Sequence, residues 1–169
     1  MGYSGHKHQK GDKNVPICDN VGNIMAPMPF KPASVNDSIL FDQSFTNLLE
    51  TIDDLHLDVA ENTGITGDPG FDSEANKNQI IAAGFIPFIK PNLRGLRDKE
   101  KINHILDEFE EKKPIYKERY KIERCNAWQD KYRKVVIRYE KLQCTTMGFH
   151  YLAYSMINFR WMFGKNGRN

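Results

Sequence analysis

Two patterns are scarce in this sequence: paired cysteines and long apolar runs. The three cysteines, Cys18, Cys125 and Cys144, are far apart, and none belongs to a CxxC pair. A disulfide framework or a zinc ribbon is therefore not predicted, and we expect reduced thiols. No run approaches the roughly 18 apolar residues of a membrane helix, and the amino-terminal segment lacks the apolar core of a signal peptide. We expect a cytoplasmic protein without a membrane-spanning segment.

The chain has no large excess of either charge, but its charges are segregated. Its 169 residues carry a net charge of +2, and 40% of them are hydrophobic and 27% charged, a composition typical of a globular protein. The length suits one domain or part of one and is too short for two. Residues 112–141 contain eleven Lys or Arg and four Asp or Glu, a net charge of +7, whereas residues 37–61 contain seven acids and no Lys or Arg. The basic segment predicts a polyanionic partner.

Hydrophobic periodicity and capping residues predict alternating strands and helices. The predicted elements, in order, are a hairpin of residues 15–19 and 24–28, a helix from Asn36 or Asp37 to about residue 51, a short strand at 65–68, a helix from Asp72 or Ser73 to residue 83, a strand at 85–89, a charged excursion at 91–113 with one or two amphipathic turns, a long helix from Pro114 to about residue 143, and an apolar helix at 149–163. Gly84 closes the second of these helices, whereas Pro16 and Pro27 disfavour central pairing in the hairpin. The order indicates an α/β domain with a helical carboxyl terminus.

Tyr116, Arg119 and Glu123 share one face of the predicted long helix. At 100° per residue, Tyr116 lies about 20° to one side of Glu123 and Arg119 about 40° to the other. The apolar residues of this helix lie on a different face: Trp128, Tyr132, Val135, Tyr139 and Leu142. Spacing alone leaves two interpretations open, an ordinary surface ion pair between Arg119 and Glu123 or a carboxylate held for function.

Asp68 is the second candidate acid. It lies in the segment Gly-Asp-Pro-Gly-Phe at 67–71, at the end of the candidate strand and before a helix. The sheets of α/β proteins place ligands at such positions, because the carboxylate is held on rigid backbone beside an open crevice. A turn aspartate that accepts hydrogen bonds from its own backbone would have the same sequence pattern, so this interpretation also stays open.

Three segments connect these two acids to one family. They read GDPGFDSEANKNQI, GFIPFIKPN and YKERYKIERCNAWQDKYRKVVIRYEKLQ, in that order, and with GYSGHKHQKGDKNVPICD and the VNDS turn they cover nearly the whole chain. In this combination the chain closely resembles the carboxyl-terminal part of the DDE transposases of bacterial and archaeal insertion sequences. The resemblance implies an RNase H-like α/β fold with a mixed sheet and helices, and DNA transposition by metal-dependent strand cleavage and strand transfer with two Mg²⁺ or Mn²⁺ ions.

Three acids hold the metal ions in that family, and the resemblance puts the second at Asp68 and the third at Glu123. Tyr116 and Arg119 match the family's Tyr-Arg-Glu signature, which implies that they orient the scissile strand through its phosphate. The final Lys of the signature falls on Asp130, and Lys131, one residue later, is the expected substitute for a DNA contact. Carboxylates suit this chemistry, because Mg²⁺ prefers hard oxygen ligands while it activates water or a 3′-hydroxyl and stabilises the leaving oxygen.

The first acid of the family ends a strand that precedes the segment matching GYSGHKHQKG. We therefore expect a single partial catalytic domain over residues 1–169, with its first strand missing and with no cleavage by this chain alone. Asp12 and Asp19 come after the required position and are not candidates. The expected partners are DNA, as element ends and target, and a missing amino-terminal half or full-length transposase.

A basic edge near the amino terminus is a further candidate DNA contact, formed by Lys7, His8, Lys10 and Lys13. His6 and His8 also have the spacing of a metal pair on a strand, but no third ligand of suitable type is near them in the sequence. Two other functions stay open. One is a noncatalytic DNA-binding fragment that regulates full-length transposase, and the other is a remnant without function.

Overall fold

The structure is a computed structural model that describes residues 2–4, 9–25 and 27–164, with side chains from residue 11 onwards. Its architecture is mixed α/β, as expected. One sheet is antiparallel, in the order β1 (Gly2–Ser4), β2 (Gln9–Lys13) and β3 (Lys31–Pro32), and the other is a parallel pair of β4 (Gly64–Gly67) and β5 (Ile86–Ile89). Within these described ranges the strands thus form two small sheets, where the resemblance implied one mixed sheet.

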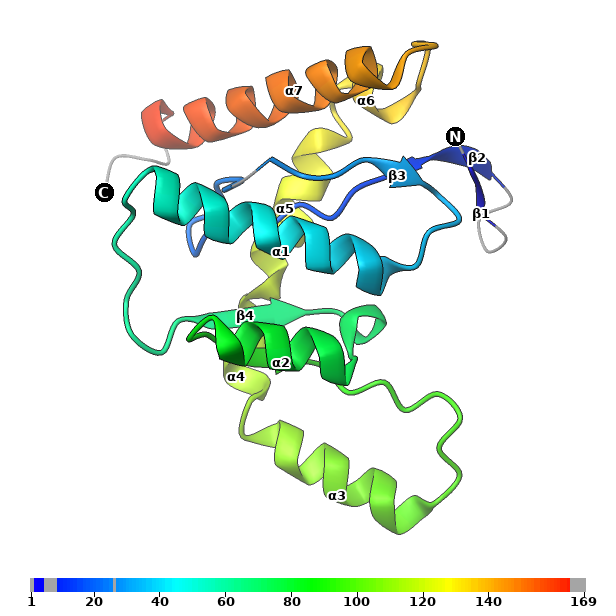
Figure 1. Cartoon of the computed structure of the whole chain (residues 1–169), viewed down its shortest axis with the longest axis vertical. Helices are drawn as coiled ribbons and strands as arrows, with labels where there is room; N and C mark the ends of the chain where they lie inside the picture. The colour runs from blue at the N-terminus through cyan, green and yellow to red at the C-terminus, as the bar shows by residue number, and fades with distance from the viewer. Residues whose placement is uncertain (1, 5–8, 26, 165–169) are drawn as a thin grey trace.

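Helices make up most of the molecule. The longer ones are α1 (Asp37–Asp54), α2 (Glu74–Ala82), α3 (Lys99–Glu110), α5 (Tyr120–Gln129) and α7 (Gln143–Phe163), and the shorter ones are η1 (Pro69–Phe71), α4 (Lys113–Tyr116), η2 (Lys117–Arg119) and α6 (Arg133–Val136). Figure 1 shows α7 along one end of the molecule, α1 in the middle, β4 with α2 beyond it, and α3 at the opposite end. The α5 helix runs between these ends and connects the β4 region to α7.

The α1 helix begins where the sequence predicts. The Asn36 side chain accepts a hydrogen bond from the Ser38 N–H at 2.9 Å, which satisfies one of the free donors at the helix start. The apolar face of α1 joins α2 and β5 in a buried cluster of Phe41, Phe45, Leu48, Ile80 and Ile89. Burial of each large apolar side chain contributes about 1.5–3 kcal/mol, so this cluster is a main source of stability next to the candidate site.

The β4, α2 and β5 elements confirm the predicted strand, helix and strand. Ser73 caps α2 by accepting the Asn76 N–H at 3.2 Å, and Gly84 follows its end with a φ of +82°, in the left-handed region that glycine adopts without strain. The two strands are parallel, with Thr66 opposite Phe88. Their carboxyl ends therefore lie at the same edge, and the chain leaves this edge into the segment that contains Asp68.

The predicted hairpin of residues 15–28 is present only as a turn with one isolated bridge, between Cys18 and Ile24. The Asp19 carboxylate holds the turn, because it accepts hydrogen bonds from the N–H groups of residues 21–23 at 2.7–2.9 Å. Pro16 and Pro27 supply no N–H for a ladder, which explains why the two flanking segments do not extend into strands.

The prediction of one long helix from Pro114 to about residue 143 is wrong. The segment contains α4, η2, α5 and α6, and it leaves helical backbone at Tyr132, with a ψ of 96°, and at Ile137, with a ψ of 111°. Helical backbone ends at Ile137, and the next residue, Arg138, turns inward to an ion pair with Asp12 on β2. Part of the predicted apolar stripe is consequently exposed, including Tyr139 and Leu142.

The remaining helices are longer than predicted. In the charged excursion, Asp98 caps α3 by accepting the N–H groups of Glu100 and Lys101, and the helix runs for 12 residues. The α7 helix begins at Gln143 rather than at residue 149, and its inner face joins Met28 and Phe30 in a second buried cluster. Among the helices in the described ranges, none combines the length and apolar character that a membrane crossing requires.

Candidate functional site

Asp68 directly follows β4, at the edge where both parallel strands end. Its backbone is extended, with φ −69° and ψ 160°, and its carbonyl accepts the Phe71 N–H at 2.9 Å, so η1 begins at Pro69. The Asp68 carboxylate does not cap this short helix, although a turn aspartate would do so. Its side chain is instead 49% exposed and contacts a residue far away in the sequence.

That residue is Arg119, which joins the two candidate acids. Its Nη1 lies 2.5 Å from Asp68 Oδ1, and its Nη2 donates a hydrogen bond to Glu123 Oε1. The Arg119 side chain is only 21% exposed, whereas the Glu123 side chain is 60% exposed. A carboxylate at the end of β4 and a carboxylate on α5 thus converge on one guanidinium, although no local spacing in the sequence connects Asp68 with Glu123.

Tyr116 lies beside this cluster. The Arg119 guanidinium carbon is 5.7 Å from the centre of the Tyr116 ring, and the same ring packs edge-on against Phe109 at a centroid distance of 5.2 Å. Partial burial raises the pKa of the Tyr116 hydroxyl, while the nearby Arg119 charge acts in the opposite direction. The hydroxyl is therefore protonated at neutral pH and can donate a hydrogen bond.

The turn at residues 19–23 fixes the position of α5. Arg124 donates to the Val21 carbonyl at 2.8 Å, and Cys125 Sγ donates to the Gly22 carbonyl at 2.9 Å. Gly22 has a φ of +99°, a conformation that favours glycine. A Cβ at this position would also lie 2.7 Å from Arg124 Nη2, so the end of that side chain would have to shift. These contacts on consecutive residues of α5 set the direction in which the preceding residue, Glu123, points.

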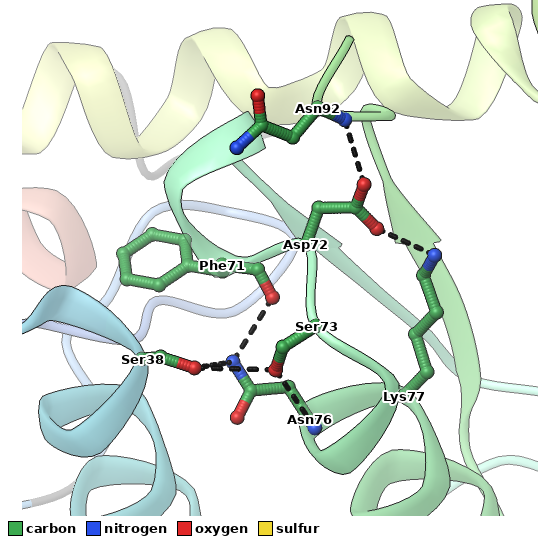
Figure 2. A network of polar contacts seen from close by, with 7 residues as sticks. All are labelled: Ser38, Phe71, Asp72, Ser73, Asn76, Lys77 and Asn92. Carbon is green, nitrogen blue, oxygen red and sulfur yellow. Dashed lines mark hydrogen bonds and ion pairs between the residues drawn. The ribbon is translucent and has the colours of Figure 1, made fainter. Parts of the chain in front are cut away.

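A polar network centred on Asn76 ties the loop after Asp68 to α1 and α2, as Figure 2 shows. The buried Asn76 amide donates from Nδ2 to the Phe71 carbonyl at 2.9 Å and to Ser38 Oγ at 3.0 Å. Ser38 Oγ also lies 3.2 Å from Ser73 Oγ. The start of α1 and the start of α2 therefore hold the same loop.

Asp72 fixes the end of this loop (Figure 2). It accepts a hydrogen bond from the Asn92 N–H at 2.6 Å and forms a 2.5 Å ion pair with Lys77 on α2. Asp72 thus has a structural role, while Asp68, four residues earlier in the same loop, points to Arg119. Support from several hydrogen bonds gives the Asp68 carboxylate the rigid backbone that a binding site needs.

The two carboxylates fit the ligand chemistry of a divalent cation in part. They supply hard oxygen donors, which Mg²⁺ and Mn²⁺ prefer, and they already face one shared cation, the Arg119 guanidinium. A metal ion between the same oxygens would take the place of this guanidinium. In the described ranges, no group of three or more His, Cys, Asp or Glu side chains is arranged to hold a metal, so Asp68 and Glu123 offer two of the ligands of such a site.

The other predicted DNA contacts have partners outside this cluster. Lys131, just after α5, has its Nζ 5.9 Å from the centre of the Trp128 ring, and Lys13 forms a 2.5 Å ion pair with Asp37 at the start of α1. Lys10 lies on β2. Lys7 and His8, together with the possible metal ligand His6, lie outside the described residues.

Two pairs in the structure were not predicted. Asp12 and Arg138 form an ion pair whose side chains are 4% and 17% exposed. The thiols of Cys18 and Cys125 form a hydrogen bond that raises the pKa of Cys18 and lowers the pKa of Cys125. Both pairs join residues more than 100 positions apart, so no local sequence signal could have identified them.

Comparisons of this chain with protein-family models, with curated proteins and with solved structures gave no match. The function of the Asp68, Arg119 and Glu123 cluster is therefore inferred from its contacts and from the residues that carry the resemblance.

Proposed function

We propose that this chain is part of the catalytic domain of an insertion-sequence DDE transposase and that it binds DNA, as element ends and target. The observation that supports this proposal best is that Asp68, after β4, and Glu123, on α5, meet at Arg119. The resemblance assigns these three residues to one site. Paired carboxylates on rigid backbone at the end of a parallel strand suit metal-dependent phosphoryl transfer.

An RNase H-like fold is part of the same proposal. The β4, α2 and β5 unit, with an acid directly after β4, is consistent with that fold. The proposal requires that further strands, from polypeptide outside the described ranges, pair with β4 and β5 to complete the mixed sheet.

Each residue of the cluster has a role in this proposal. Asp68 and Glu123 bind the divalent metal, together with a third acid from polypeptide outside this chain. Mg²⁺ or Mn²⁺, when bound, activates water or a 3′-hydroxyl and stabilises the leaving oxygen. Arg119 leaves the acids and donates two hydrogen bonds to a DNA phosphate, because the guanidinium is a planar fork that matches two phosphate oxygens. The protonated Tyr116 hydroxyl donates a further hydrogen bond to the phosphate.

The distribution of positive charge supports DNA binding. Residues 112–141 carry a net charge of +7, and several basic side chains of this region and of α7 lie over aromatic rings. Arg124 is 4.3 Å from the Trp161 ring centre, and Arg160 and Lys131 lie 5.5 Å and 5.9 Å from that of Trp128. A cation over an aromatic ring keeps its charge, so it can still contact phosphate.

Titration of labelled duplex DNA with the chain at two salt concentrations tests the binding part of the proposal. Contacts that neutralise phosphates release counterions, so we expect dissociation constants of roughly 10⁻⁴ to 10⁻⁶ M, little sequence preference, and weaker binding at higher salt. Affinity that is unchanged by salt would contradict electrostatic DNA binding.

Nicking of supercoiled plasmid with Mg²⁺ or Mn²⁺ tests the catalytic part. We expect no nicking by this chain alone, and nicking by the chain extended with the polypeptide that supplies the third acid. In the extended protein, Asp68→Asn and Glu123→Gln should each abolish nicking, whereas Glu108→Gln on α3, where the native side chain is 67% exposed, should leave it intact. Full activity of either site variant would show that the acids are misassigned.

A noncatalytic DNA-binding fragment is the second candidate function. It is favoured by the same ion pairs, because Arg119 occupies both acids and neutralises part of their charge. DNA binding that is unaffected by a chelator, combined with no nicking by the extended protein, would support this alternative over the first proposal.

A further inference from the structure

The outer face of α7 carries an exposed apolar stripe. Phe149, Leu152, Met156, Phe159 and Phe163 follow one another at intervals of three and four residues. The last four are between 51% and 65% exposed, although they are large and apolar. Alternating intervals of three and four place side chains along one seam of a helix, which is the spacing by which two helices pair through knobs-into-holes packing.

The other face of α7 is already in use. Ala153, Tyr154 and Ile157 are buried, and Tyr154 and Ile157 pack with Met28 and Phe30 in the second buried cluster. Figure 1 shows α7 at the edge of the molecule, with the other elements on one side of it. The exposed stripe is therefore separate from the surface that holds α7 on its own chain.

We propose that α7 pairs with α7 of a second copy of this chain, antiparallel, with Met156 near the twofold axis. Such an arrangement sets Phe163 of each copy near Phe149 of the other. It is independent of the proposed catalytic function, because it uses none of the residues of the Asp68, Arg119 and Glu123 cluster.

The charge of the seam favours a second copy over a charged partner. Arg160 is the single charged residue of α7 from Gln143 to Phe163, so two copies of this helix meet without a run of like charges. Gly148 and Ser155 flank the seam on one side, and a Cβ added at Gly148 would contact nothing within 4 Å. Small flanking residues allow two helix backbones to approach closely.

The exposed area is sufficient for a weak dimer. Phe159 and Phe163 are 65% and 62% exposed, and an aromatic side chain buries about 150–250 Å² in full, so each contributes about 100–150 Å². With Leu152, Met156 and the adjacent Met162, which is 60% exposed, the apolar surface offers on the order of 500–600 Å² per copy, or about 1,000–1,200 Å² in a dimer, which is the lower end for specific interfaces.

A groove beside the stripe provides complementary shape. It has a volume of about 580 Å³ and is lined by Tyr132, Ser155, Met156, Phe159, Arg160 and Phe163, with Gly164 at its end. In the proposed dimer the groove of one copy receives apolar side chains of the other copy. The interface is isologous, so it closes at two copies and does not propagate into a filament.

Sedimentation equilibrium of the chain at several concentrations is the first measurement. We expect the apparent mass to rise from that of a monomer, 19.6 kDa, to twice that value, with a dissociation constant of roughly 1–100 μM for an interface of this size. Met156→Glu should raise the dissociation constant roughly tenfold or more, because the twofold axis brings the introduced charge close to its copy. Leu152→Glu should also weaken the dimer, because it puts a charge into the apolar seam.

Ile81→Glu on α2 is the matched control, because Ile81 and Leu152 are both 58% exposed on helices. It should leave the dimer unchanged, and far-UV circular dichroism checks that all variants fold. A monomer at all concentrations, a continuous series of larger species, or a dimer that is unaffected by Leu152→Glu and Met156→Glu would each overturn the proposal.

Cross-linking tests the geometry separately. In a Cys144→Ser background, which removes the exposed native thiol, Met156→Cys near the twofold axis should form a disulfide between two copies under mild oxidation. Ile81→Cys should not. Equal cross-linking at both positions would show random collision and would contradict the antiparallel pairing.

Discussion

Replacing Arg119 with Gln removes the cation that Asp68 and Glu123 share, and we expect the variant to bind Mn²⁺ more tightly than the natural sequence. In the natural chain a metal ion must displace the guanidinium from both carboxylates or bind beside its positive charge. The side chains of Asp68 and Glu123 are 49% and 60% exposed, so a water-like dielectric applies. A charge of +2 about 5 Å from a charge of +1 is then disfavoured by about 1.7 kcal/mol, which is roughly a tenfold change in affinity.

The same substitution should cost little stability. Exposed ion pairs contribute about 0.2–1 kcal/mol each, and the contact of Arg119 with the Tyr116 ring adds about 0.5–1 kcal/mol. The variant should therefore lose roughly 1–3 kcal/mol and remain folded. Denaturant unfolding at fixed pH measures this loss and shows whether metal binding is compared between two folded proteins.

The assay is a titration of Mn²⁺ in low-salt buffer, with free Mn²⁺ followed by its electron paramagnetic resonance signal. Lys117→Gln, two residues earlier and exposed, removes the same unit of charge and controls for the overall field of the protein. A variant with both Asp68→Asn and Glu123→Gln should lose the site. Affinity of Arg119→Gln that equals or falls below that of the natural sequence, or that rises equally in Lys117→Gln, would refute the reasoning.

Three further predictions concern residues outside this cluster. Burial lowers the pKa of His150 from 6.5 to about 4, so the unfolded chain takes up a proton at a higher pH than the folded chain does. The free energy of unfolding should therefore fall by on the order of 2–4 kcal/mol as the pH is lowered from 6.5 to 4. Urea unfolding at several pH values measures this dependence, and a His150→Gln variant should lack it. Gly22→Ala should destabilise the fold by about 1–3 kcal/mol in urea unfolding, and by more than Gly84→Ala, since both have positive φ but only Gly22 has Arg124 in the way. A low-molecular-weight disulfide should oxidise the contacting thiols of Cys18 and Cys125 to an intramolecular disulfide, detected by peptide mapping; persistence of both thiols, with only Cys144 modified, would contradict it.

Local signals in the sequence were sufficient for α1, α2 and the β4 and β5 strands. Asn36 and Ser73 cap the helices whose starts they were predicted to mark, and Gly84 adopts the predicted left-handed conformation. Each of these features acts within a few residues along the chain. Its stabilising contact is therefore visible in the sequence before any tertiary contact is known.

The second break in the predicted long helix, at Ile137, lies next to a tertiary contact. Arg138 forms its ion pair with Asp12, which is 126 positions earlier in the chain. A charge left without its partner at so buried a position costs about 3–5 kcal/mol, whereas helix propensities differ by about 0.7 kcal/mol per residue or less among ordinary residues. The long-range pair therefore outweighs the local preference for helix, and the sequence contains no periodicity that links the two residues.

The candidate site depends on one local contact, between Arg119 and Glu123, and on one long-range contact, between Arg119 and Asp68. The i, i+4 spacing of Arg119 and Glu123 was visible in the sequence, but an ordinary surface pair requires only those two residues. The guanidinium here divides its nitrogens between two acids from different elements, because the contacts of α5 with Val21 and Gly22 orient the helix toward β4. A guanidinium is a rigid, planar fork, so two simultaneous pairs restrict the distance between the two carboxylates. A metal site needs its acids held close together despite their repulsion, and Arg119 achieves this before any other cation binds. The response of Mn²⁺ affinity to Arg119→Gln therefore separates a site prepared for a cation from a pair of acids that Arg119 merely neutralises.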